Sequence, residues 1–247
     1  MNTKTRIKTS KAKKAFTLAE VLITIGVIGV VAALTIPALI TNINSRRYKS
    51  GLKKTISTLN QAVRMSQAKY DFNFADLDNP FAEGMEECSK QNPENVKTIC
   101  SLFNGTLSGI TYLGNVEENA TLKSVYKEAF EEIAEEIKDL YAWQLSDGAI
   151  LFIEKTLGDD WYSGHFHSPE NYHGYEDVIW GYIDLNGISK PNKYTRCSDN
   201  NDFGFEEGGK ENSCVVKNKD INDIYGIFIY DSTVEAKDNA TAYVLNM

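Results

Sequence analysis

The chain has 247 residues, of which 26 are Lys or Arg and 34 are Asp or Glu, so its formal net charge is −8. Because 42% of the residues are hydrophobic and 11% are aromatic, the composition excludes a wholly disordered chain and a collagen-like repeat. Residues 1–15 hold six basic side chains and no acidic one, which leaves a charge of −14 on residues 16–247. A body this acidic repels phosphate, so nucleic acid is not expected as a partner of the whole surface.

An uncharged apolar segment follows the basic amino terminus. No residue from Val21 to Ile40 is charged, and a helix of this length spans about 30 Å, the thickness of the hydrocarbon core of a membrane. The segment is longer than the apolar part of an ordinary secretory signal, and it ends in Ile-Pro-Ala-Leu-Ile rather than in a small-x-small cleavage site. It therefore predicts a membrane-spanning helix.

The junction before this segment is more specific, because residues 13–20 read Lys-Lys-Ala-Phe-Thr-Leu-Ala-Glu. A glutamate at depth in a membrane span costs about 2.5–3.5 kcal/mol, so such a residue usually has a partner. A basic leader that ends in a small residue, then Phe-Thr-Leu-x-Glu and a long apolar helix, closely resembles the amino terminus of type IV prepilins and pseudopilins. The resemblance is strong over residues 13–40, extends by pattern to about residue 70, and covers the rest only in general design.

The resemblance implies how the chain is processed. A prepilin peptidase would cut between Ala15 and Phe16, and the new amino group of Phe16 would be methylated. Glu20 would then be the fifth residue of the mature chain and would meet the terminal amine of a neighbouring subunit during assembly. Two opposite buried charges offset each other's desolvation, which makes such a pair physically reasonable. Ala15 stands where the family more often has glycine, a difference expected to lower the efficiency of cleavage rather than recognition.

Two features of the span concern its shape and its orientation. Pro37 removes a backbone donor, so we expect a kink or a loosened turn there, and the resemblance implies local melting on assembly. Six basic residues precede the span and five follow it closely, so the positive-inside rule does not set the orientation. The cysteines and the resemblance favour a carboxyl-terminal domain outside the cytoplasm.

Beyond the span, an apolar stripe with helical spacing continues. Its members are Tyr48, Leu52, Ile56, Leu59 and Val63, followed by Met65 or Ser66. The stripe predicts one helix from about residue 18 to residue 70, about 80 Å long. We therefore expect four parts: a removed leader (1–15), a transmembrane or filament-core helix (16–43), its amphipathic continuation (44–70) and a globular extracytoplasmic domain (71–247).

The globular part combines a helical pattern with strand patterns. Residues 71–118 are mixed, and a second helix is expected over 120–144, with its apolar face formed by Leu122, Val125, Tyr126, Ala129, Phe130, Ile133, Ile137, Leu140 and Tyr141. Strands are expected at 149–153, 178–183 and 226–230, with a weaker one at 242–245. Short strands between Asp-Gly and Asn-Gly turns indicate an antiparallel sheet. The predicted fold class is α+β, a long helix packed on an antiparallel sheet, which also resembles the pilin fold.

The cysteines predict the redox compartment. Cys88, Cys100, Cys197 and Cys214 form no CxxC pair, which argues against a zinc site built from four thiolates. Among the three possible pairings we favour Cys88–Cys100 with Cys197–Cys214, which closes loops of about 12 and 17 residues. Such disulfides need an oxidising compartment, and four reduced thiols in a cytosolic protein are the alternative.

Two clusters are candidate metal sites. Asp184, Asn186 and Asp202 lie in a stretch that resembles one found in some pilin-like chains, and their oxygen atoms could hold Ca²⁺. A strand-end turn, in which the same side chains satisfy backbone groups, is the favoured alternative. His165, His167 and His173 could bind zinc, but they lie among turn formers, and a surface loop is favoured over a zinc-dependent hydrolase.

We expect a structural subunit and no enzyme, because nothing in the sequence supports an enzymatic activity: we find no phosphate loop, nucleophile elbow or HExxH motif. The resemblance implies a type IV pilus-like or type II secretion filament, with other pilin subunits, prepilin peptidase and the inner-membrane assembly platform as partners. The 232 residues left after cleavage favour a minor or tip subunit. We expect a single-pass inner-membrane precursor, then a cell-surface or periplasmic filament, without a cofactor unless calcium binds. The alternative is a single-span, membrane-anchored extracytoplasmic binding domain, in which Glu20 has no use.

Overall fold

The chain divides into two compact units, Met1–Thr41 and Asn42–Met247. Helix α1 (Leu18–Tyr70) has 53 residues and belongs to both units, which confirms the helix predicted over residues 18–70. The computed structural model describes residues 16–71, 99–131, 140–157, 179–198, 205–206, 210–211, 214–230 and 233–247.

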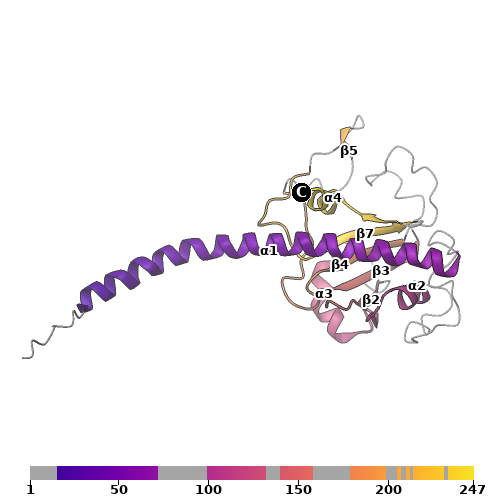
Figure 1. The fold of residues 1–247 in the computed structure, drawn as a ribbon, viewed down its shortest axis with the longest axis horizontal. Coiled ribbons are helices and arrows are strands. Elements are labelled where there is room, and N and C mark those ends of the chain that lie inside the picture. The colour runs from indigo at the N-terminus through magenta and orange to yellow at the C-terminus, as the bar shows by residue number, and fades with distance from the viewer. Residues whose placement is uncertain are drawn as a thin grey trace, which may run out of the picture. The chain divides into compact units, whose positions relative to one another are not determined.

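A six-stranded antiparallel sheet organises the carboxyl-terminal unit, with the strand order β1-β2-β3-β4-β7-β8 (Figure 1). Its strands are β1 (Thr111–Asn115), β2 (Leu140–Gln144), β3 (Ile150–Leu157), β4 (Ile179–Asp184), β7 (Ile224–Tyr230) and β8 (Thr233–Ala236). Two short strands, β5 (Phe205–Glu206) and β6 (Lys210–Glu211), pair separately. The described residues also form the helices α2 (Ile99–Thr106), α3 (Ala120–Glu131) and α4 (Asn239–Asn246). This is the predicted α+β fold.

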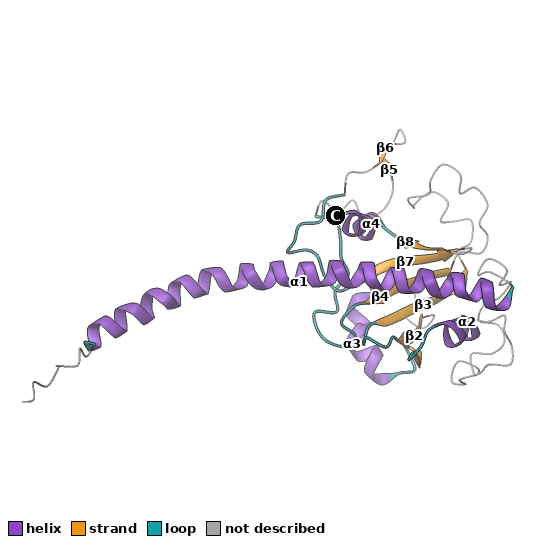
Figure 2. Ribbon diagram, viewed as in Figure 1, coloured by secondary structure: helices purple, strands orange, loops and turns teal. Residues whose placement is uncertain are grey.

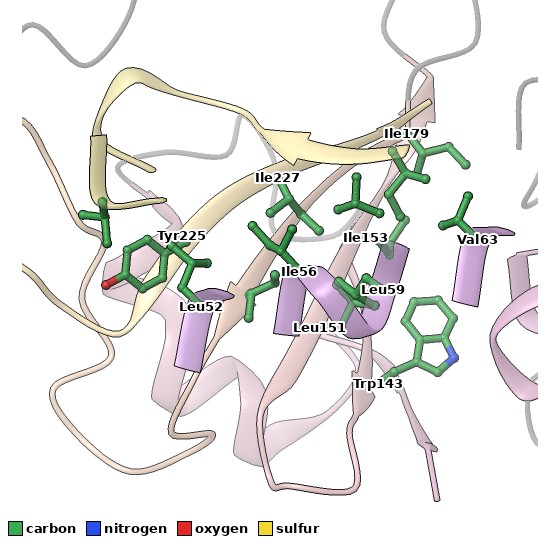
Figure 3. Close-up of a cluster of buried hydrophobic side chains, with 14 of the residues drawn as sticks. Leu52, Ile56, Leu59, Val63, Trp143, Leu151, Ile153, Ile179, Tyr225 and Ile227 are labelled. Carbon is green, nitrogen blue, oxygen red and sulfur yellow. The ribbon is translucent and has the colours of Figure 1, made fainter. Parts of the chain in front are cut away.

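One face of the sheet packs against the second half of α1 (Figure 3). The predicted stripe is buried at Tyr48, Leu52, Ile56, Leu59 and Val63, and Ser66 rather than Met65 continues it. Because strand side chains alternate between faces, every second residue of β3, β4 and β7 meets this stripe. These partners include Leu151, Ile153, Ile179, Ile183, Tyr225 and Ile227. Each fully buried aliphatic side chain contributes about 1.5–3 kcal/mol, so this contact is a major source of stability.

The opposite face of the sheet is covered by α3. Its buried residues Leu122, Tyr126 and Phe130 recur every fourth position, which is the spacing of one helix face. The ring of Phe130 lies 4.9 Å from that of Phe152 on β3 and 5.3 Å from that of Tyr182 on β4. Figure 2 shows α2 and α3 towards the β2 end of the sheet and α4 towards its β8 end. The sheet is thus the middle layer of the unit.

The helix predicted over residues 120–144 is wrong at its end. The structure describes α3 as far as Glu131, and residues 140–144 form β2, paired antiparallel with β3. Leu140 and Ala142 are buried in the α3 cluster, whereas Trp143 is buried in the α1 cluster, as the two faces of a strand require. Backbone pairing with β3 and burial on both faces override the helical spacing of the preceding residues.

The weak strand predicted at 242–245 is also wrong, because these residues lie in α4. Asp238 caps this helix, and its carboxylate accepts the backbone N–H of Thr241 at 2.7 Å. Ala240 and Val244, four residues apart, turn into the α1 cluster. The cap and the four-residue spacing select a helix over a strand. The strands predicted at 149–153, 178–183 and 226–230 are confirmed as β3, β4 and β7.

Candidate functional site

The start of α1 is closed by a capping box, in which a Thr and a Glu three residues apart satisfy each other's backbone. The carboxylate of Glu20 accepts the backbone N–H of Thr17 at 2.8 Å and its hydroxyl at 2.8 Å. In return, the Thr17 hydroxyl oxygen accepts the backbone N–H of Glu20 at 3.2 Å. The sequence Phe-Thr-Leu-Ala-Glu therefore starts the helix at Leu18, directly after Phe16 and Thr17.

The capping box leaves its own residues accessible. Phe16 is 86% exposed. Glu20 is also exposed, although its carboxylate accepts hydrogen bonds from Thr17, three residues earlier. The box also holds the carboxylate at the amino-terminal end of a helix, where the helix dipole favours negative charge. Chemically, the arrangement offers an oriented anion that a cationic group of another chain can reach.

The first half of α1 has the surface of a transmembrane helix. Exposed apolar side chains surround it, among them Leu22, Ile25, Ile28, Val31, Leu34, Ile36 and Leu39. Within the described part of the chain, α1 alone is long and apolar enough to cross a membrane. Three threonine hydroxyls in this half satisfy their donors within the helix. Thr24, Thr35 and Thr41 donate to backbone carbonyls of α1 at 2.9–3.0 Å. Lipid or neighbouring apolar helices are the surroundings that such a surface fits.

Pro37 lies inside α1, and the helix continues on both sides of it. Because proline has no N–H, the carbonyl of Ala33 lacks its helical donor. The Thr41 hydroxyl donates to the carbonyl of Pro37 at 3.0 Å, which supports the next turn. The predicted kink and the melting on assembly stay predictions.

One of the two predicted disulfides is confirmed. Cys197 and Cys214 form a disulfide, and their Cα atoms are 5.3 Å apart. Cys100 is buried and is also disulfide-bonded. Cys88 lies outside the described residues, so its predicted pairing with Cys100 stays a prediction.

The calcium candidates Asp184 and Asn186 take part in a turn at the end of β4. The Asp184 carboxylate accepts the Tyr126 hydroxyl at 2.8 Å and the backbone N–H of Asn186 at 2.9 Å, while the Asn186 amide donates to the carbonyl of Lys190 at 3.2 Å. No group of three metal-binding side chains occurs among the described residues, and Asp202 lies outside them. The calcium site stays a prediction, as does zinc at His165, His167 and His173, which also lie outside the described residues.

The structure adds a second buried carboxylate that no motif indicated. Asp223 accepts the backbone N–H groups of Asn192 at 2.8 Å and Lys193 at 2.7 Å. Burial, with the charge of Asp223 as the second cause, raises the pKa of Asp184 to about 8, and burial also raises the pKa of Asp223. Asp223 precedes β7 in sequence, 39 residues after Asp184, so only the pairing of β4 with β7 brings the two together.

Comparison with known proteins gives one match, at the amino terminus. Residues 10–36 match the family model of the prokaryotic N-terminal methylation motif. No curated protein and no solved structure matches the chain. The matched residues include Phe16, the capping box and most of the exposed apolar surface, and the match confirms the resemblance of this segment to type IV pilin-like proteins and pseudopilins.

Proposed function

We propose that this chain is a structural subunit of a type IV pilus-like or type II secretion filament, assembled through the first half of α1. The methylation motif over residues 10–36 is the observation that carries the proposal, and it points to a structural subunit rather than an enzyme. The exposed apolar surface of the same helix supports it, because that surface requires lipid or other helices as its surroundings. Other pilin subunits, prepilin peptidase and an inner-membrane assembly platform are the proposed partners.

The first step of the proposed pathway is cleavage between Ala15 and Phe16, followed by methylation of the Phe16 amine. Exposure of Phe16 and its place outside α1 support access by a peptidase and a methyltransferase. Cleavage removes the six basic residues of the leader and creates one new amino group two residues before the helix.

In the second step, Glu20 attracts the amine of a neighbouring subunit. Its carboxylate is exposed and held at the end of the helix by Thr17. A pair of opposite charges lowers the cost of carrying each into an apolar filament core, whereas either charge alone is expensive there. Pro37 would then give the helix local freedom to repack among its neighbours.

The second unit is proposed to face the periplasm or the outside and then to be displayed on the filament. The Cys197–Cys214 disulfide supports an oxidising compartment. The size of the mature chain favours a minor or tip subunit, since it exceeds what a minimal repeating subunit needs.

The mature amino terminus is the first test. Intact mass and terminal peptide sequencing of the membrane-derived protein should give a chain that starts at methylated Phe16. A chain that starts at Met1 would contradict processing and would support the membrane-anchored binding domain instead.

The second test separates the charge of Glu20 from its capping role. Glu20→Gln keeps a side chain that can close the capping box but removes the charge, whereas Glu20→Ala removes both. We expect both variants to be cut at Phe16 and both to be depleted from sheared filaments. If Glu20→Gln enters filaments as well as the wild type does, the proposed charge pair is wrong and only the cap matters.

A further inference from the structure

The turn that follows the Cys197–Cys214 disulfide contacts α1 directly after its apolar segment. The side-chain amide of Asn218 donates to the side-chain oxygen of Asn42 at 3.1 Å, and the Ser45 hydroxyl donates to the side-chain oxygen of Asn218 at 3.3 Å. The apolar run ends at Ile40, so these contacts begin two residues beyond it. A segment 176 residues later in the chain thus lies beside the point where α1 leaves a membrane.

This contact gathers four basic side chains from two parts of the chain. Two of them flank Asn218 in sequence, and the other two lie four and seven residues after Asn42, on the same face of α1. We call the four residues the basic collar: Arg46, Lys49, Lys217 and Lys219.

The cations of the basic collar are available to a partner. Three of them are exposed, and Lys49 is half-buried. In the part of the chain that the structure describes, none of the four side chains forms a hydrogen bond or an ion pair. α1 has no acidic residue after its first turn, and Asp220, which follows the lysines, accepts the Ser198 hydroxyl at 2.9 Å. The basic collar is therefore unpaired positive charge on a chain whose residues 16–247 carry −14.

The turn that carries the two lysines is held in place by the disulfide and by backbone contacts. The N–H of Ser198 donates to the carbonyl of Val215 at 2.9 Å, and the N–H of Lys217 donates to the Ser198 hydroxyl at 3.1 Å. The N–H of Asp220 donates to the carbonyl of Lys217 at 2.8 Å and closes the turn. A partner therefore meets cations on a fixed backbone, and binding orders little additional chain.

We propose that the basic collar binds the headgroups of anionic phospholipids where α1 leaves the membrane. The inference goes beyond the proposed function, because it requires α1 to span a membrane but requires neither cleavage at Phe16 nor filament assembly. Arg46 follows Ile40 by six residues, which is about 9 Å along the helix axis, and long basic side chains extend from such positions to the headgroups. Each Lys or Arg close to an anionic membrane surface adds attraction, so the four together select anionic lipids.

The surroundings of the basic collar favour lipid over nucleic acid. Ile43 on α1 is 55% exposed, and Val215 beside the turn is 46% exposed. Apolar side chains next to cations suit the boundary between headgroups and acyl chains. A nucleic acid carries charge along its whole length, so it would extend past the collar onto the acidic remainder of the chain. The collar also attaches the acidic carboxyl-terminal unit to an anionic surface that would otherwise repel it.

Lipid binding to the full-length chain in detergent tests the proposal. Native mass spectrometry with added dioleoylphosphatidylglycerol or dioleoylphosphatidylcholine compares an anionic and a zwitterionic lipid that have the same acyl chains. We expect the wild type to bind phosphatidylglycerol at least about tenfold more tightly, and we expect higher salt to reduce this preference. Equal affinity for the two lipids would overturn the proposal.

Two matched double variants locate the binding. Lys217→Glu with Lys219→Glu should lower the preference for phosphatidylglycerol at least about tenfold, because the turn then repels the headgroup. Arg64→Glu with Lys69→Glu is the control, since it changes the charge equally at exposed positions near the far end of α1, and it should keep the wild-type preference. Equal losses in the two double variants would overturn the proposal. The milder pair Lys217→Gln with Lys219→Gln should give a smaller loss, and it decides the question if the charge-reversed chain does not fold.

The same spectra separate this inference from the proposed function. A mass that starts at Met1 would contradict the proposed processing, while the lipid preference of that chain still decides whether the collar binds anionic headgroups. A short DNA duplex that binds the wild type and displaces phosphatidylglycerol would overturn the proposal in favour of a nucleic acid.

Discussion

Helix α1 is one element with two kinds of surface, and the contrast between its halves explains the chain's organisation. Residues 21–40 expose apolar side chains around the whole helix, whereas residues 48–66 bury a single stripe against the sheet. A helix that is apolar all round suits lipid or a bundle of helices, and one with a stripe suits the surface of a globular unit. The contribution of an apolar side chain to stability therefore depends on the half in which it lies.

The same substitution in the two halves gives the largest expected difference. Leu59 is fully buried against the sheet, so Leu59→Ala should lower the free energy of unfolding of the carboxyl-terminal unit by about 2–5 kcal/mol. Leu34 is 75% exposed, and Leu34→Ala should leave that free energy unchanged. Denaturant unfolding in detergent, followed by tryptophan fluorescence, measures both. Equal losses would contradict the division of α1 into two environments.

Removal of the Cys197–Cys214 disulfide should also affect only the second unit. The double variant Cys197→Ser with Cys214→Ser opens a loop of 17 residues and should lower the free energy of unfolding by about 2–4 kcal/mol. Substitution is preferable to chemical reduction, because Cys100 is disulfide-bonded too. Processing at Phe16 should be unchanged in cell membranes. A loss of processing would show that the amino-terminal step depends on the folded state of the second unit.

The two halves of α1 also differ from the rest of the chain in how well the sequence predicts them. The run over 21–40 is apolar throughout and the stripe from Tyr48 to Val63 has helical spacing, so each predicts a helix from local sequence, and both lie in α1. Residues 140–144 follow a helical pattern without a break, and only their pairing with β3, formed later in the chain, makes them a strand. Non-local pairing of this kind leaves no signal in the local spacing.

The difference between local and non-local contacts also explains which polar residues could be identified from the sequence. Glu20 was found because it belongs to a local sequence motif, whereas its capping hydrogen bonds with Thr17, three residues away, were not predicted. The β4 turn was expected from Asp184 and Asn186, and the structure gives these residues the backbone contacts of such a turn. Asp223 comes from a distant segment that reaches the turn through the sheet, and no spacing in the sequence predicts that approach.

A pH titration should act on the second unit and sharpen the contrast further. The pKa of Asp184 is raised from its ordinary value to about 8, so between pH 4 and pH 8 the folded state holds a proton that the unfolded state releases. The contribution of Asp184 to stability is therefore fully present below pH 4 and is lost as the pH rises towards 8, by at most about 1.4 kcal/mol per pH unit. The raised pKa of Asp223 acts in the same direction.

Two substitutions near Asp184 separate its contribution. Asp184→Asn should flatten the loss of stability between pH 5 and pH 8, measured by denaturant unfolding at each pH. Tyr126→Phe removes a hydroxyl that favours the ionised form, so it should extend the loss to higher pH. A slope that is the same in Asp184→Asn and in the wild type would show that other groups carry the pH dependence.

The smallest expected effect lies at the first turn of α1 and leaves the second unit untouched. Thr17→Ala removes the hydroxyl of the capping box, a change that costs about 0.5–2 kcal/mol of local helix stability. Amide exchange of Glu20 in detergent should become about 2- to 30-fold faster, because its N–H donates to that hydroxyl. Thr17→Ser should restore slow exchange.

Thr35→Ala is the matched control, since the Thr35 hydroxyl donates to a carbonyl within the same half of α1 but does not cap the helix. If both alanine variants change the exchange of Glu20 equally, the effect comes from the general loss of a hydroxyl and the capping box does not hold the start of the helix.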